Sequence, residues 1–109
     1  AIQAPLSFLN ADPFGRDLRA RIRQASSPVR IVVLEASAIL DIDFTAAQML
    51  TSLIRECHDQ NISFAGARLE SLRAQAALKR FGLDRELGPG RIYRSVEEAV
   101  EALTKEANA

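Results

Sequence analysis

The chain has 109 residues, 48% of them hydrophobic and 26% charged, and its fourteen basic and fourteen acidic residues cancel. These values fit one globular domain, residues 1–109, with one core. A neutral chain without Trp offers neither a general positive field nor a stacking platform for bases, so we expect no nucleic-acid partner. No apolar run approaches the roughly 18 residues of a membrane span. The chain does not begin with Met, which favours a domain cut from a longer protein or a processed chain.

The first third of the chain predicts two strands around a helix. "LSF", Leu6 to Phe8, is a candidate short strand. "DPFGRDLRARIRQA" then predicts a helix with Asp12 as its N-cap and Pro at the first helical position. The apolar residues of this helix share one stripe: Phe14, Leu18, Ile22 and Ala25. The run Ile31 to Leu34 is continuous and mostly β-branched, which predicts a central strand covered on both faces, with Val33 buried.

The middle of the chain predicts helix, strand and helix in turn. A helix begins at Thr45 in "TAAQMLTSLIRECHDQ", and "NISFAGA" provides the next strand. A further helix is expected from Leu69 to Phe81, closed by Gly82 as the residue after its C-cap. The residues expected to face the core from this helix are Leu72, Ala76 and Leu78.

The last segment predicts a short strand at Ile92 to Tyr93 and a final helix. Ser95 and Glu98 match the S-x-x-E capping box that starts such a helix. Its expected inner face consists of Val96, Ala99, Val100 and Leu103. The alternation of strands and helices predicts an α/β fold: a single domain with a mostly parallel central sheet of about four strands and four helices.

Residues that could carry catalysis are sparse. His58 is the only histidine and follows Cys57, the only cysteine, but adjacent helical positions point about 100° apart and form no dyad. We therefore expect a buried thiol beside an exposed imidazole. The phosphate-binding glycine motifs are missing, and "GPG" at 88–90 indicates a turn. The sequence predicts no enzyme, no metal and no cofactor.

Basic residues crowd the first helix. Arg16, Arg19 and Arg23 share one face of it, opposite the apolar stripe. We favour a solvated helix face, because charge runs usually have that explanation. The alternative is a basic patch that meets a membrane surface or an acidic partner.

The hydroxyl of Thr45 allows two interpretations. Thr45 and Gln48 match the T-x-x-Q capping box, in which case Thr45→Ala costs about 1 kcal/mol. A helix N-terminus also favours a bound anion, so Thr45 is a candidate phospho-acceptor or partner contact. Asp41 and Asp43 would repel an added phosphate, which suits a repulsive switch at a docking surface. From the residues alone we favour the cap and expect Thr45 to be exposed at the end of the central strand.

The stretch "IVVLEASAILDIDFTAAQML" resembles the signature of STAS domains, in which an apolar strand, an acidic loop and D-[ST]-[ST]-G lead into a helix. "PLSFLNADPFGRDL" and "GRIYRSVEEAVEAL" resemble the corresponding ends of STAS domains from SulP-type (sulfate permease) anion transporters. By this resemblance, Asp43 takes the motif aspartate and Thr45 the position that is phosphorylated in bacterial anti-sigma factor antagonists. Phe44 and Ala46 replace the first hydroxyl and the glycine of the motif, and Glu35 replaces a common aspartate.

The resemblance implies a non-catalytic regulatory and interaction module. It would be the cytoplasmic domain of a SulP-like sulfate or anion transporter, held at the inner membrane through a transmembrane region outside this sequence. Its partner would be that transmembrane part or another regulatory protein. The alternative is a free-standing anti-sigma factor antagonist switched by phosphorylation at Thr45. Nucleotide binding has been proposed for STAS domains, but only helix N-termini and the "GPG" turn could support it here.

Overall fold

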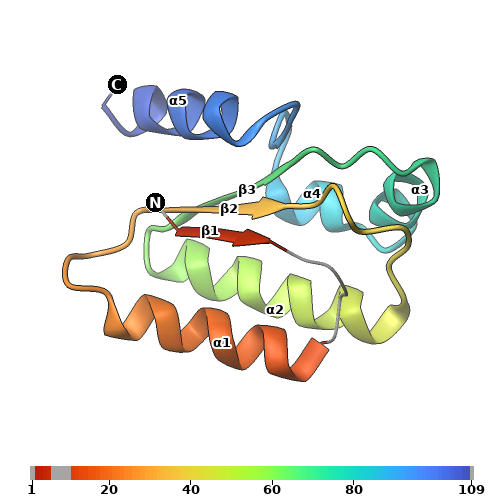
Figure 1. Ribbon diagram of the computed structural model, residues 1–109, viewed down its shortest axis with the longest axis horizontal. Helices are drawn as coiled ribbons and strands as arrows, with labels where there is room; N and C mark the ends of the chain where they lie inside the picture. The colour runs from red at the N-terminus through yellow and green to blue at the C-terminus, as the bar shows by residue number, and fades with distance from the viewer. Residues whose placement is uncertain (1, 6–10, 109) are drawn as a thin grey trace.

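A computed structural model describes residues 2–5 and 11–108 (Figure 1). The strands are β1 (Ile2–Pro5), β2 (Ile31–Glu35), β3 (Ser63–Ala67) and β4 (Ile92–Tyr93). The helices are α1 (Ala11–Gln24), α2 (Phe44–Asp59), α3 (Leu72–Arg80), α4 (Leu83–Leu87) and α5 (Val96–Ala107). The strands form one parallel sheet in the order β1-β2-β3-β4. The predicted α/β class and parallel sheet are confirmed.

Strand β2 lies inside the sheet and is covered on both faces. Its side chains alternate between two hydrophobic clusters: Val32 and Leu34 belong to the larger one, Ile31 and Val33 to the smaller one. Figure 1 shows α5 over one face of the sheet and α1 and α2 over the other. Val33 has no exposed surface, as its place in the apolar run predicts.

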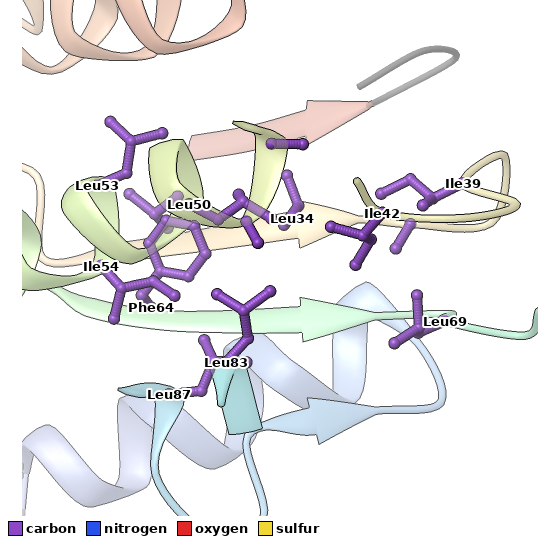
Figure 2. Packing of buried hydrophobic residues seen from close by; sticks show 14 of the residues in the cluster. Leu34, Ile39, Ile42, Leu50, Leu53, Ile54, Phe64, Leu69, Leu83 and Leu87 are labelled. Carbon is purple, nitrogen blue, oxygen red and sulfur yellow. The ribbon is translucent and has the colours of Figure 1, made fainter. Parts of the chain in front are cut away.

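The two clusters differ in size and composition. The larger cluster draws on α1 to α4 and on the loops after β2 and β3; Figure 2 shows its aliphatic side chains around Phe64. The smaller cluster is built from six residues, three of them alanines, and among the described helices α5 alone covers it. Its members are Ile31, Val33, Ala65, Ala67, Ala99 and Leu103.

The start of the chain departs from the expected element bounds. Helix α1 begins at Ala11, so Asp12 lies in the first turn and is not the N-cap. Pro13 still fits there, because the first-turn N–H groups have no partner within the helix. The described first strand is β1, and the strand expected at Leu6 to Phe8 lies outside the described residues.

The third predicted helix is shorter than expected and turned about its axis. Ser71 is its N-cap, and Ala74 and Ala77 are buried while Leu72 and Ala76 are exposed and Leu78 is partly buried. The predicted inner face was therefore wrong for the first two positions. Leu69 fills the core just before the helix, so the helix presents small alanines to the same cluster.

A short helix that was not predicted follows it. Gly82 adopts the left-handed conformation, with φ of 74°, which ends α3 as expected and lets the chain start α4 at once. Leu83 and Leu87, four residues apart, are both buried. Within the described residues there are thus five helices where four were expected.

Helix α5 matches its prediction. The Ser95 hydroxyl accepts a hydrogen bond from the Glu98 N–H at 3.0 Å, and Ala99 and Leu103 are buried. The carboxylate of Glu98 pairs with Arg94 at 3.3 Å, so only the serine half of the capping box is formed.

Candidate functional site

The loop between β2 and α2, residues 36–43, lies at the carboxyl end of the sheet, where parallel α/β folds present binding groups. Ile39 and Ile42 are buried in the larger cluster and hold the loop against the core. Between them, Leu40 points outward with 73% of its surface exposed. The loop is therefore anchored by its isoleucines while it presents its other side chains to solvent.

The first turn of α2 corrects the predicted cap. The Asp43 Oδ1 atom accepts a hydrogen bond from the Ala46 N–H at 2.8 Å, so Asp43 is the N-cap and the helix begins at Phe44. Ile42, just before the cap, is buried and fixes the chain where it enters the helix. Thr45 is the second helical residue and is exposed, and its hydroxyl has no hydrogen-bond partner among the described residues. Thr45 is thus a first-turn hydroxyl, as expected, but not the cap.

Helix α3 runs beside this loop and is tied to it at one end. The Ser71 hydroxyl donates to the Leu40 carbonyl oxygen at 2.7 Å. The Arg73 guanidinium pairs with the Asp41 carboxylate at 3.0 Å, and both side chains are largely exposed. Of the two loop acids, Asp41 is neutralised by an arginine and Asp43 by a helix N-terminus.

Aromatic contact ties the loop to the other end of α3. The rings of Phe44 and Phe81 lie with their centroids 6.2 Å apart and tilted by 58°. The Arg80 guanidinium stands over the Phe81 ring, 4.9 Å from its centroid. Phe44 is 62% exposed and Leu72 is 79% exposed. Leu40, Phe44 and Leu72 are thus exposed apolar side chains of the loop and of the first turns of α2 and α3, and we call them the apolar surface. They were not predicted, because Leu72 was expected inward and Phe44 was considered only as a departure from a motif.

Only part of the basic face of α1 is available to contact a partner. Arg19 forms two hydrogen bonds to Glu56 of α2, at 2.9 and 2.7 Å, while Arg16 and Arg23 are exposed. These hydrogen bonds from Arg19 lower the pKa of Glu56 below its ordinary value. Arg19 therefore joins two helices, and a basic patch on α1 is reduced to its other two arginines.

The described residues offer little for catalysis or metal binding. Cys57 is buried, and desolvation together with the Glu56 charge raises the pKa of its thiol to about 11, so the thiolate is scarce near neutral pH. His58 is exposed on the next position of α2. Across residues 2–5 and 11–108, no three His, Cys, Asp or Glu side chains gather as a metal would need. In the same part of the chain, every helix is too short or too polar to cross a membrane.

Comparison with known proteins identifies the family. The sequence model of the STAS domain matches residues 1–99. The chain belongs to the STAS domain family. A probable sulfate transporter of Mycobacterium tuberculosis is 34% identical to it over 107 residues, a match that covers 94% of this chain. The chain spans 18% of that transporter's length, so the STAS domain corresponds to a small part of its relative.

Solved structures show the same fold. The STAS domain of a SulP transporter from Vibrio cholerae matches 97% of this chain and 79% of that chain with a TM-score of 0.71 at 22% identity. A component of the stressosome, a signal integration and transduction hub, matches 98% of this chain and 92% of that chain with a TM-score of 0.76 at 16% identity. At these identities the likeness concerns the fold alone, which transporter domains and signalling proteins share.

Proposed function

We propose that this STAS domain is the non-catalytic interaction and regulatory module of a SulP-type anion transporter. The observation that carries the proposal is the 34% identity to a probable sulfate transporter across nearly the whole chain. In this arrangement the domain lies on the cytoplasmic side and is tethered through a transmembrane region. Its partner is that region or a regulatory protein that acts on it.

The loop at residues 36–43 and the start of α2 are the proposed contact surface. Asp41 and Asp43 lie on the anchored loop and Thr45 in the first turn of α2, and Leu40 and Phe44 add exposed apolar area beside them. Exposed apolar groups among fixed polar ones are typical of interaction surfaces. This geometry suits recognition of another protein and provides no reacting group.

Sulfate transport by the proposed whole transporter, which would contain this domain, tests the proposal. We expect deletion of the segment that encodes residues 1–109 to lower sulfate uptake into membrane vesicles, while the transmembrane part is still inserted. Co-purification of that part with the tagged STAS domain, expressed separately, measures the contact directly. Unchanged uptake together with no co-purification would contradict the transporter role.

A second function follows from the exposed Thr45 hydroxyl. An anti-sigma factor antagonist switched by phosphorylation needs an accessible hydroxyl near a partner surface, and Thr45 is exposed in the first turn of α2. Phosphate there would stand beside Asp41 and Asp43 and weaken docking by repulsion. Thr45→Glu should then weaken partner binding far more than Thr45→Ala does. Equal binding by both variants, with no phosphopeptide detected by mass spectrometry from cells, would exclude the switch.

A further inference from the structure

A groove runs along the exposed side of α2, next to the apolar surface described above. It is a hollow of about 270 Å³ lined by Phe44, Ala47, Gln48, Thr51, Ser52, Arg55 and Phe81. We call it the Phe44 groove. The two phenylalanines form one wall, and hydroxyl and amide side chains of α2 line the rest. Its shape and lining suit an inserted side chain flanked by polar contacts.

The other members of the apolar surface, Leu40 and Leu72, lie near the first turn of α3. Phe44 stands at the end of the helix near Phe81, and Leu40 stands at the other end near Ser71. The loop from Leu40 to Phe44 therefore runs alongside the helix, with Leu72 exposed next to it. Several exposed large apolar side chains on one loop and on the helix beside it mark a candidate interaction site.

Among the described residues, unpaired positive charge lies at the end of α3 that adjoins the groove. Helix α3 carries three basic residues and no acidic one. Arg73 is matched by Asp41, and Arg55 across the groove is matched by Glu86 at 2.6 Å. Lys79 and Arg80 are exposed, and no described carboxylate lies within ion-pair distance of either. Lys79 and Arg80 therefore leave unpaired positive charge beside Phe81, which favours a partner with acidic groups at this end of the groove.

We propose that the Phe44 groove and the adjoining face of α3 dock an acidic amphipathic segment of a protein partner. An apolar anchor of the partner enters the groove against Phe44 and Phe81, and its carboxylates meet Lys79 and Arg80. This inference rests on the proposed role as an interaction module and specifies the chemistry of its partner. The hollow favours a protein segment over a flat lipid surface. A second copy docked face to face would bring the same cations together.

Binding of a designed peptide to the 109-residue chain tests this. The probe is a short fluorescent helical peptide with leucines at helical spacing on one face and glutamates elsewhere. We expect saturable binding that weakens as salt is added. Phe44→Ser, and separately Lys79→Glu with Arg80→Glu, should each weaken it at least about tenfold, as loss of an anchor or charge pair does. Both changes lie on exposed residues, and melting curves check that the fold is kept.

Matched controls distinguish peptide binding at this surface from non-specific attraction between opposite charges. Arg16→Glu with Arg23→Glu makes the same charge change on α1 and should leave peptide binding within about twofold, because these residues lie outside the groove. A peptide with lysines in place of glutamates, or with serines in place of leucines, should not bind.

Several results would overturn the inference. These are no saturable binding, equal binding of the lysine peptide, or equal loss with the α1 control. Tighter binding to anionic lipid vesicles that depends on the same residues would assign the surface to a membrane. A dimer that Phe44→Ser dissociates would assign it to a second copy. If peptide binding holds while domain deletion leaves transport intact, the docking site stands and the transporter role fails.

Discussion

The two faces of the sheet are closed in different ways. On one face a single helix, α5, packs on Ile31 and Val33 of β2 and on alanines of β3, with Ala65, Ala67 and Ala99 fully buried. On the other face, α1 to α4 and two loops surround larger aliphatic side chains and leave a small apolar cavity of about 30 Å³. The first face is closed by one helix over side chains that, Ile31 excepted, have no exposed surface, and the second is assembled from more pieces with a gap among them. The candidate surface lies on the assembled side.

This difference suggests that the α5 face mainly stabilises the fold, while the other face can also present side chains to a partner. The α5 face is formed by one helix whose acids are mostly paired, for example Glu106 with Arg91 at 2.6 Å. The assembled face ends in an anchored loop and a short helix, whose outward side chains do not all serve packing. Phe44 and Leu72 can therefore be exposed without loss of the core beneath them, and that freedom is what an interaction surface needs.

A charged side chain introduced into the sheet beneath α5 should reduce the stability of the domain more than any other proposed substitution. Val33→Asp should unfold the domain, because the carboxylate is buried without a partner between β2 and α5. Circular dichroism and thermal melting measure this. Val100→Asp, on the half-buried rim of the same cluster, is the matched control and should stay folded with a lower melting temperature. An unchanged melting temperature for Val33→Asp would show that this face is not closed as described.

The next largest difference is expected when a larger side chain is introduced on each face, because the two faces should lose different amounts of unfolding free energy. Ala99→Leu should cost about 1 to 3 kcal/mol, since Ala99 is fully buried between α5 and the sheet and a larger side chain there must displace its neighbours. Ala36→Val adds methyl groups beside the cavity on the other face and should change the free energy of unfolding by less than about 1 kcal/mol. Urea denaturation measures both. Equal costs would mean that the two faces are packed alike.

The caps of α2 and α5 allow a finer comparison. Asp43→Ala and Ser95→Ala should each cost about 1 kcal/mol, because each side chain accepts a hydrogen bond from a first-turn N–H. Thr45→Ala should cost less than about 0.5 kcal/mol, since the exposed hydroxyl satisfies no backbone group. Chemical denaturation of the three variants tests this. A cost for Thr45→Ala equal to that for Asp43→Ala would restore Thr45 as a cap.

Loss of the ion pair between α1 and α2 should affect stability less than loss of either helix cap. Hydrogen bonds from Arg19 lower the pKa of Glu56 from 4.5, so the pair stabilises the fold above that pH and the gain is lost as the pH falls through the lowered pKa. Both side chains are more than a third exposed, so Glu56→Gln should cost less than about 1 kcal/mol at pH 7. Urea denaturation at pH 7 and at about pH 3 should show the difference shrinking at the lower pH. A difference that grows on acidification would contradict this assignment.

Local signals in the sequence determined the features that depend on neighbouring residues. The apolar run at Ile31 to Leu34 predicted a strand covered on both faces, because such a run has no side that water could accept. Ser95 predicted the start of α5, and Gly82 predicted the end of α3, because caps and left-handed turns act within a few residues. The α/β fold followed from the order of these elements.

Only the tertiary structure decided which of several local options was used. Thr45 was predicted to cap α2, but burial of Ile42 in the core fixes the chain so that Asp43 fills that role. Burial of Leu69 rotated α3 and left Leu72 outside, although its spacing suited the core. The contact between Phe44 and Phe81 joins residues far apart in the chain, and no local pattern encodes it. The candidate surface depends on such contacts, because packing between distant segments decides which apolar side chains remain exposed.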